Sequence, residues 1–238
     1  LGPGTFRNLA GASFTVDGEG DFGVNYGGTN AFHNAGTFVK QGTGTTIFSV
    51  VAFYNAGGSI DVQAGGLQLS SVGSNDGLLK VAAGAGLTIS SDFDFTATSV
   101  LTAAGAVTFS GGTQIFAGQF LPTGSVTFTG GTTVVNNTFL PTGAVTFSGG
   151  NAVFNAPQTF AGLNLSGGSL GGSGDVTVTG ALNWSGGIMY GTGRTIVPAG
   201  ATLAISANSQ KDLSRTLENA GTATYANANF GFNQYNLG

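Results

Sequence analysis

The chain has 238 residues, of which 7% are charged and 41% hydrophobic, with a formal net charge of −4 and no cysteine. Disordered chains combine high charge with few aromatic residues, so the 19 phenylalanines indicate a folded protein with a large apolar core. The absence of cysteine excludes disulfides and thiolate chemistry, and six basic residues are too few for a nucleic-acid partner.

The beginning of the chain carries no recognisable targeting pattern. A signal peptide would begin with a charged segment followed by an apolar one, and the chain does not open with that pattern. No apolar run approaches the roughly 20 residues of a membrane-spanning helix, so we expect no membrane insertion. Because the sequence begins at Leu1 within repeat-like residues, we interpret it as a mature or excised part of a longer exported product.

The densest acidic run in the chain comes early, at residues 17–21. Its three carboxylates, Asp17, Glu19 and Asp21, alternate with glycine. Such a loop could hold Ca²⁺, which prefers oxygen ligands, but it lacks the twelve-residue pattern of an EF-hand. The simpler interpretation is a solvated loop. We therefore expect no cofactor, with calcium at these three residues as the alternative.

His33 is the only histidine. The motif around it recurs 21 residues later with Tyr54 in its place, and again near the C-terminus with Glu218. A position that accepts His, Tyr and Glu is most simply an outward surface site, and neither a serine–histidine–acid triad nor a zinc site has the other residues that it needs. The asparagine that precedes Ala-Gly in each copy is expected to lie in a turn: Asn34, Asn55 and Asn219.

The clearest internal repeat lies between residues 101 and 160. Val-Thr-Phe-Ser-Gly-Gly-Thr at 107–113 recurs in nearly identical form at 126–132 and 145–151, 19 residues apart each time. The alternation of apolar and polar residues is typical of a strand with one buried face, and Gly-Gly ends it. A second short strand and another turn complete each unit, and helix-period patterns are absent.

Strands that repeat at so short an interval can stack on their own copies. The sequence therefore predicts an all-β fold, a single-stranded right-handed parallel β-helix with roughly a dozen coils of about 19–21 residues. We expect the solenoid to span residues 1–224, and the segment 225–238 to cover a sheet edge or contact a neighbouring subunit. The predicted core ladders are Phe109, Phe128 and Phe147; Phe120, Phe139 and Phe160; and Ile115, Val134 and Val153.

Catalysis is not expected from the distribution of charge. Enzymes with this fold that cleave carbohydrates need two or three carboxylates, or a carboxylate with a cation, converging on one face. The ten acidic residues are scattered, and no charged residue occurs between 95 and 174. We therefore expect no enzymatic activity and no catalytic residue.

Four segments resemble a known group of bacterial surface proteins, the filamentous-haemagglutinin-like, β-strand-repeat proteins. They begin with Asn-Ala-Gly-Thr-Phe at 34–38 and continue at 163–170, 182–187 and 215–223. The resemblance covers most of the chain and rests on period and composition. It implies a right-handed β-helix used as an adhesin, stalk or fibre outside the cell, with no catalytic residues to carry over.

These features predict a non-enzymatic structural protein at the bacterial cell surface, a segment of a self-associating fibre or adhesin stalk. Both ends of a β-solenoid expose unpaired strand edges, which template further pairing. The expected partner is therefore the chain itself, through end-to-end stacking or continuation of the solenoid.

The alternative is a surface-binding module on a flat Thr/Asn-lined face. Outward Thr108, Thr127 and Thr146 would form a row of the kind that binds ice, although paired Thr-x-Thr is not repeated from coil to coil. Exposed aromatic residues such as Tyr54 or Trp184 could instead bind glycans of a host or environmental surface.

Overall fold

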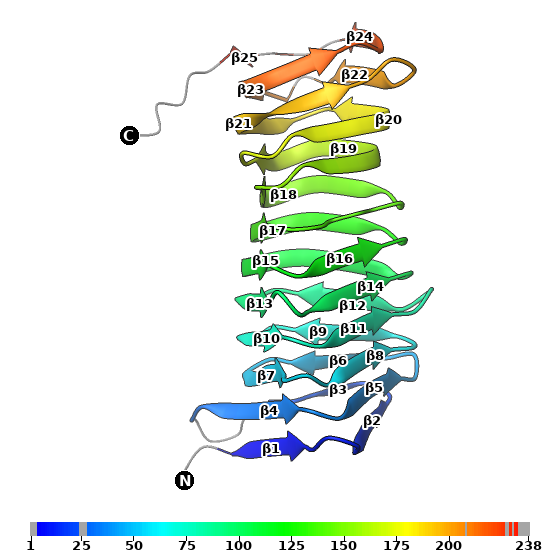
Figure 1. Ribbon diagram of the computed structural model, residues 1–238, viewed down its shortest axis with the longest axis vertical. Coiled ribbons are helices and arrows are strands. Elements are labelled where there is room, and N and C mark those ends of the chain that lie inside the picture. The colour runs from blue at the N-terminus through cyan, green and yellow to red at the C-terminus, as the bar shows by residue number, and fades with distance from the viewer. Residues whose placement is uncertain (1–3, 24–27, 208, 227–228, 230, 233–238) are drawn as a thin grey trace.

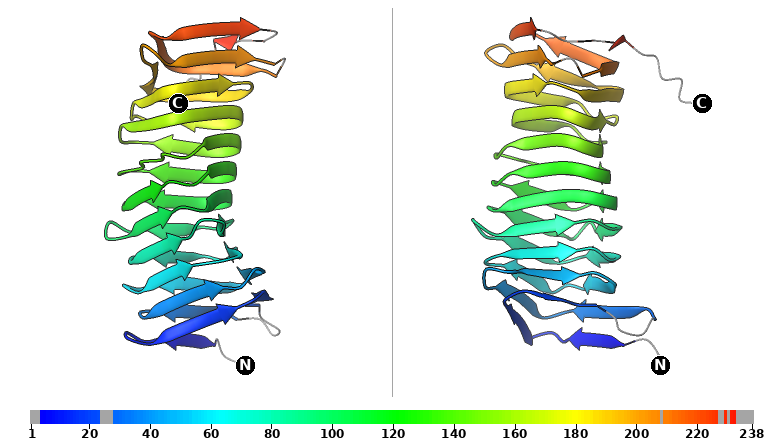
Figure 2. Two further views of the ribbon diagram at one scale, coloured as in Figure 1. Left: turned by 90° about the vertical axis from the view of Figure 1, so that its right-hand side faces the viewer. Right: turned by 180° about the vertical axis from the view of Figure 1, so that it is seen from behind.

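A computed structural model of the chain describes residues 4–23, 28–207, 209–226, 229, 231 and 232. In these ranges the protein contains strands and no helix, and parallel strands stack as a β-solenoid of about ten turns (Figure 1). Views from the side and from behind show the coils stacked along one axis, with the first described strands at one end of the stack and the last at the other (Figure 2). The predicted parallel solenoid is confirmed, with about ten turns instead of a dozen. No helix in the described part of the chain could span a membrane.

The strands form two parallel sheets. The six-stranded sheet contains β2 (Ser13–Asp17), β5 (Thr37–Gln41), β8 (Ser59–Val62), β11 (Leu78–Val81), β14 (Val100–Ala103) and β16 (Gln119–Pro122). The 19-stranded sheet contains β1 (Thr5–Asn8), β3 (Gly20–Asp21), β4 (Asn30–Asn34), β6 (Thr45–Phe48), β7 (Val51–Asn55), β9 (Gly66–Leu69), β10 (Gly73–Asn75), β12 (Gly86–Ile89), β13 (Phe93–Phe95), β15 (Ala106–Phe116), β17 (Val126–Val135), β18 (Val145–Phe154), β19 (Gln158–Gly171), β20 (Val176–Trp184), β21 (Gly187–Val197), β22 (Thr202–Ser206), β23 (Lys211–Asn219), β24 (Thr222–Ala226) and β25 (Gly231–Phe232).

The solenoid continues past residue 224, the predicted boundary. β24 extends to Ala226 and pairs with β22, and β25 pairs with β23. Residues 227, 228, 230 and 233–238, which belong to the predicted terminal segment, lie outside the described residues.

A ladder of inward side chains on one side of the coil supplies much of the core. Phe109, Phe128 and Phe147 are in register on β15, β17 and β18, with ring centroids 5.3 Å and 4.6 Å apart. All three are buried, so each contributes on the order of 2 kcal/mol through apolar burial. The same ladder, here called the Phe109 ladder, includes Phe48, Leu69, Ile89, Phe109, Phe128, Phe147, Leu165 and Trp184.

A second inward ladder lies on the side formed by the six-stranded sheet. Phe120 stacks on Phe139 with 4.8 Å between ring centroids, and Phe160 meets Phe139 edge-on at 5.5 Å. Towards the N-terminus, Leu101 pairs with Phe120, and Leu79 pairs with Leu101. The residues with the predicted 19- and 21-residue spacings therefore share one buried column.

The third predicted ladder is corrected by the structure. Ile115 is 39% exposed, and Val134 and Val153 are only partly buried. The alternation of inward and outward side chains reverses across the preceding Gly-Gly corner, where the second glycine has a positive φ. The positions on either side of these residues point inward instead: Gln114 and Phe116, Thr133 and Val135, and Ala152 and Phe154.

Glycine is required at this corner for two reasons. Gly131 has a φ of +71°, a conformation that L side chains rarely adopt, and a Cβ there would lie 2.3 Å from the backbone oxygen of Gly112 on the coil below. The second glycine of the corner has positive φ in five successive coils: Gly112, Gly131, Gly150, Gly168 and Gly187.

Asparagines on successive coils form a buried ladder, which the sequence did not predict; two of its members, Asn34 and Asn55, precede Ala-Gly. Asn34, Asn55 and Asn75 are fully buried at the ends of β4, β7 and β10. Each Nδ2 donates to the Oδ1 of the next coil, at 2.7 Å from Asn8 to Asn34, 2.7 Å from Asn34 to Asn55 and 2.6 Å from Asn55 to Asn75. Asn219 is exposed and bonds only locally, to the backbone oxygen of Gly221.

Substitution of a central ladder asparagine should destabilise the fold. Asn55→Ala removes the acceptor of Asn34 and the donor to Asn75 and to the Gly58 oxygen. Buried polar groups without partners are costly, so we expect a loss of about 3 kcal/mol in urea unfolding. Asn219→Ala, in the same Asn-Ala-Gly motif, is the control and should change stability by less than about 0.5 kcal/mol. Equal effects of the two substitutions would contradict this ladder.

Candidate functional site

The acidic run of the calcium hypothesis is divided between two sides of the first coil. Asp17 ends β2 in the six-stranded sheet, whereas Asp21 ends β3 in the other sheet. Asp21 Oδ1 accepts a hydrogen bond of 2.7 Å from Ser49 Oγ. Among the described residues, no group of three or more His, Asp or Glu side chains could hold a metal ion. The structure therefore does not bring Asp17, Glu19 and Asp21 together as a cation site.

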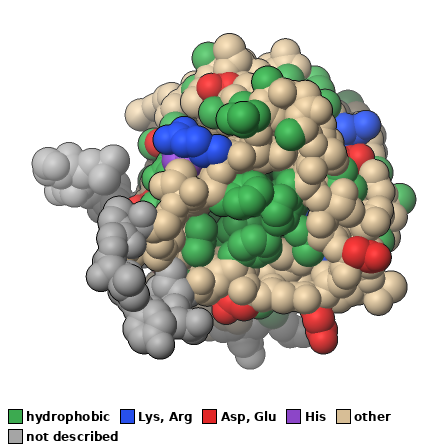
Figure 3. Space-filling view, turned by 90° about the horizontal axis from the view of Figure 1, so that it is seen from below, with side chains coloured by type: hydrophobic (Ala, Val, Ile, Leu, Met, Phe, Trp, Pro, Cys, Tyr) green, Lys and Arg blue, Asp and Glu red, His purple; other side chains and the backbone are tan. Residues whose placement is uncertain are grey.

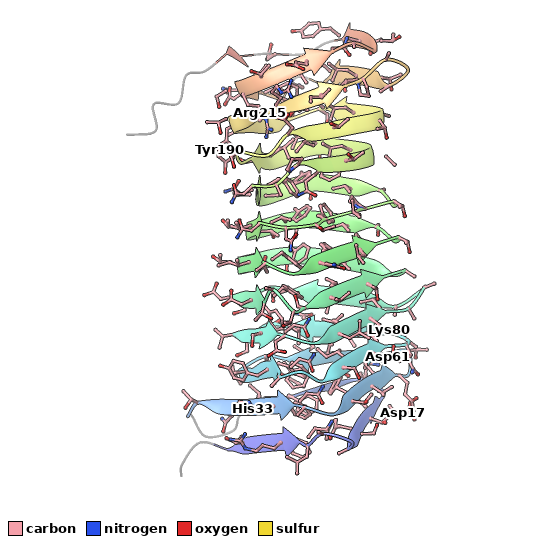
Figure 4. The ribbon with its side chains drawn as sticks, viewed as in Figure 1. Asp17, His33, Asp61, Lys80, Tyr190 and Arg215 are labelled. Carbon is pink, nitrogen blue, oxygen red and sulfur yellow. The ribbon has the colours of Figure 1, made fainter. Side chains whose placement is uncertain are left out.

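His33 lies on the outward face of β4, as its replacement pattern predicts. Its ring stacks on that of Tyr54 in the next coil, with centroids 5.0 Å apart, and Arg7 is its register partner in the first coil. Figure 4 shows His33 on the N-terminal part of the stack. The side chain is one member of a surface stack of neighbouring coils.

Trp184 is not available to bind a glycan. It is fully buried, in register with Leu165 in the Phe109 ladder. The expectation of an exposed Trp184 is wrong, because the alternation of its strand puts Trp184 on the inward side, like Leu182. Of the two aromatic residues considered for glycan binding, only Tyr54 lies at the surface, where it is partly buried.

A row of polar side chains follows the outward side of the Phe109 ladder. Four threonines and two asparagines lie in register on six successive coils, and Asn183 donates to Asn164 at 2.9 Å. A second row lies two residues further along each strand, and some of its hydroxyl groups already donate hydrogen bonds to the backbone. Thr129 Oγ1 donates to the backbone oxygen of Phe109, and Ser166 Oγ donates to that of Phe147. The first row consists of Thr88, Thr108, Thr127, Thr146, Asn164 and Asn183.

A shallow depression of about 410 Å³ lies on the outward face of the six-stranded sheet. Asp61 and Lys80 are register partners there, on neighbouring coils of the same side (Figure 4). The turn after β11 is two residues longer than the turn after β14, and each contributes one lining residue, Ala82 and Ala104. Asp61 accepts a hydrogen bond of 2.8 Å from Gln63. One carboxylate and one ammonium group line this depression, without the second carboxylate that glycoside hydrolysis requires.

Three cations are buried, which the sequence did not predict. Lys40 is fully buried between Val16 and Val62 in the inward column of β5, and its Nζ donates to the backbone oxygens of Gln41 and Gly42 at 2.8 and 2.9 Å. Strict alternation from buried Phe38 would have predicted this orientation. The other two cations, Lys211 and Arg215, likewise bond to backbone oxygens.

A cluster of charged groups lies near the C-terminal end. Arg194 bonds to Asp175 on the preceding coil and to both carboxylate oxygens of Glu218 on the following one, at 3.2 Å. These bonds hold the pKa of Asp175 below its usual value. Burial lowers the pKa of the neighbouring Arg215 to about 10. Because these groups join three successive coils and bind backbone oxygens, their observed contacts are structural.

The N-terminal end of the stack exposes the apolar core. Phe6 is 49% exposed, and Phe14 and Phe22 are partly buried. Phe6 meets Phe14 edge-on at 5.0 Å and stacks on Phe32 at 4.9 Å. Seen from below, apolar side chains occupy the centre of this end and polar ones its rim (Figure 3). We call the surface formed by Phe6, Phe14 and Phe22 the aromatic end face.

Comparisons of the chain with protein-family models, curated proteins and solved structures find no match. The candidate functional surface therefore rests on geometry. The aromatic end face combines exposed apolar area with strand edges, whereas the outward faces of the coils present single charges, hydroxyls and amides.

The buried lysine predicts a specific dependence of stability on pH. Burial lowers the pKa of Lys40 below its ordinary 10.5, against an opposing effect of Asp17. The folded chain then binds fewer protons than the unfolded chain between the lowered pKa and 10.5, so Lys40 makes stability rise with pH in that window. The unfolding free energy of the unaltered chain minus that of Lys40→Met should increase as pH approaches 10.5.

Unfolding in urea at several pH values measures this difference. Lys80→Met removes an exposed lysine and is the matched control. If the unfolding free energy of the unaltered chain minus that of Lys40→Met stayed constant or decreased as the pH rises, the proposed effect of burial on the pKa of Lys40 would be contradicted.

Proposed function

We propose that this chain is a non-enzymatic structural solenoid, a segment of a self-associating extracellular fibre or adhesin stalk. The observation that carries the proposal is the aromatic end face, where the core is open at one end of a regular stack. We place the protein at the bacterial cell surface, in the manner of the filamentous-haemagglutinin-like proteins that its repeats resemble. Its proposed partner is a second copy of the chain.

The energetics of the end face favour the addition of another coil. In the described part of the chain, β1, β2 and β3 pair on one edge only, with β4, β5 and β6. A coil added at this end would provide backbone hydrogen-bond partners for the free edges. It would also cover Phe6, Phe14 and Phe22, each worth on the order of 2 kcal/mol when fully buried. Both effects act in the direction of the solenoid axis, which is what a fibre requires.

The sides of the solenoid support a structural role. Inward positions carry continuous ladders, and the longest uncharged stretch of the sequence, residues 95–174, lies in the middle of the stack. Coils that share such ladders resist bending and local opening, because the inward side chains of each coil are buried against those of the next. A rigid spacer of this kind holds its ends apart without a binding pocket along its length.

The Thr/Asn row supports a second candidate function, binding to ice or carbohydrate through a flat face. The row is regular over six coils. We place this function second because Thr129 and Ser166 in the adjacent row direct hydroxyl hydrogens to the backbone. One regular row of polar groups therefore remains, whereas matching the two-dimensional lattice of an ice surface would require two adjacent rows.

Association through the aromatic end face can be tested with single substitutions. Phe6→Lys places a charge at the end face, where burial in a contact would be costly. We expect the unaltered chain to gain mass with concentration in sedimentation and to form rods in electron microscopy. Phe6→Lys should weaken association at least tenfold, equivalent to about 1.4 kcal/mol.

Leu140→Lys is the matched control, because Leu140 is 53% exposed on the side of the stack. It should associate like the unaltered chain, and circular dichroism should show that both variants fold. Monomers at every concentration, or equal behaviour of the two variants, would overturn the proposed function.

A further inference from the structure

The Phe109 ladder has an aromatic residue at each end. Towards the N-terminus, Phe22 stacks on Phe48 with centroids 4.2 Å apart and planes within 3°. Towards the C-terminus, Ile205 pairs with Trp184, and Tyr225 on β24 pairs with Ile205. Phe22 is partly buried and Tyr225 is 60% exposed. One continuous column of side chains therefore emerges at both ends of the molecule.

The C-terminal end also leaves apolar side chains incompletely covered. Ile205, Leu213 and Leu217 pack against the core but are only partly buried, like Phe14 and Phe22 at the other end. All five residues of β24 are exposed. Apolar side chains are thus partly buried at both ends of the molecule. A contact between the two ends would bury the apolar side chains of both.

The direction of the strands distinguishes the two ways in which copies could meet. Every strand pair in the described solenoid is parallel. Contact between the C-terminal end of one copy and the N-terminal end of the next preserves that direction and keeps inward columns over inward columns. A two-fold contact between identical end faces reverses the direction and gives a closed dimer. Only the first arrangement continues the ladder already present.

We propose that copies of this chain associate head to tail, with Tyr225 of one copy stacked on Phe22 of the next. This inference rests on the proposed self-association and adds its polarity and register. The outward neighbours of these two residues belong to one column as well, which begins at Asp21, includes Thr127 and ends at Thr224. In the assembly, Thr224 of one copy therefore lies beside Asp21 of the next. Because the contact is heterologous, it repeats into an open fibre.

Cysteine cross-linking tests this register, since the chain has no cysteine of its own. Neighbouring parallel strands are about 4.8 Å apart, within the Cα–Cα range of disulfides. Asp21→Cys and Thr224→Cys are both exposed positions. Mixed and mildly oxidised, the two single variants should give a disulfide-linked heterodimer at least tenfold more abundant than either variant alone gives a homodimer. Thr127→Cys, in the same column at mid-stack, is the control and should cross-link to neither.

The outcomes separate this inference from the function on which it rests. Efficient homodimers of Asp21→Cys alone would show contact between identical end faces and overturn the head-to-tail arrangement, while self-association through the aromatic end face would stand. Assembly of the unaltered chain without any specific cross-link would overturn the register in the same way. If the unaltered chain does not assemble at all, both the proposed function and this inference fail.

Discussion

The structure depends on one constraint, the stacking of inward side chains on equivalent side chains of the next coil. The ring centroids of Phe109 and Phe128 lie 5.3 Å apart, and those of Phe128 and Phe147 lie 4.6 Å apart. All three side chains are fully or almost fully buried, so each ring is covered largely by its two neighbours in the ladder. A single coil of about 20 residues could not bury such a ring on its own, and stability comes from contacts between adjacent repeats. Among the described residues, the first and the last coil each pair with another coil on one side only. Exposure of Phe6 and Tyr225 at opposite ends is therefore a direct consequence of the interaction that holds the middle together.

Polar side chains inside the stack obey the same rule of vertical pairing. Asn34, Asn55 and Asn75 bond to one another through side-chain amides, and Gln114 accepts from Thr133 on the next coil. The vertical spacing that suits stacked rings also suits an amide that donates upward and accepts from below. Lys40 donates from its Nζ to backbone oxygens instead: those of Gln41 and Gly42 in its own turn and, at 3.5 Å, that of Ala64 on the next coil. These groups fix the register, since a slip by one residue would leave each buried donor without its acceptor.

The sequence predicted the period, the parallel stacking and the Phe109 ladder, because identical motifs 19 residues apart admit few other arrangements. It failed where local geometry changes the alternation of side chains. Ile115 was expected in the core, but the glycine corner before it reverses inward and outward positions. Asn55 was assigned to a turn from residue preference alone, although its position in the repeat places it inside. The aromatic end face could not be predicted, because exposure at an end depends on which coils are adjacent.

The central claim is that side chains one period apart lie directly over one another. The most direct measurement is ¹⁹F–¹⁹F dipolar coupling between fluorophenylalanines placed in pairs at positions 109, 128 and 147. The account predicts strong coupling for Phe109 with Phe128 and for Phe128 with Phe147, in line with their centroid distances of 5.3 Å and 4.6 Å, and much weaker coupling for Phe109 with Phe147. Absence of coupling between the adjacent pairs, or equal coupling in all three, would contradict it.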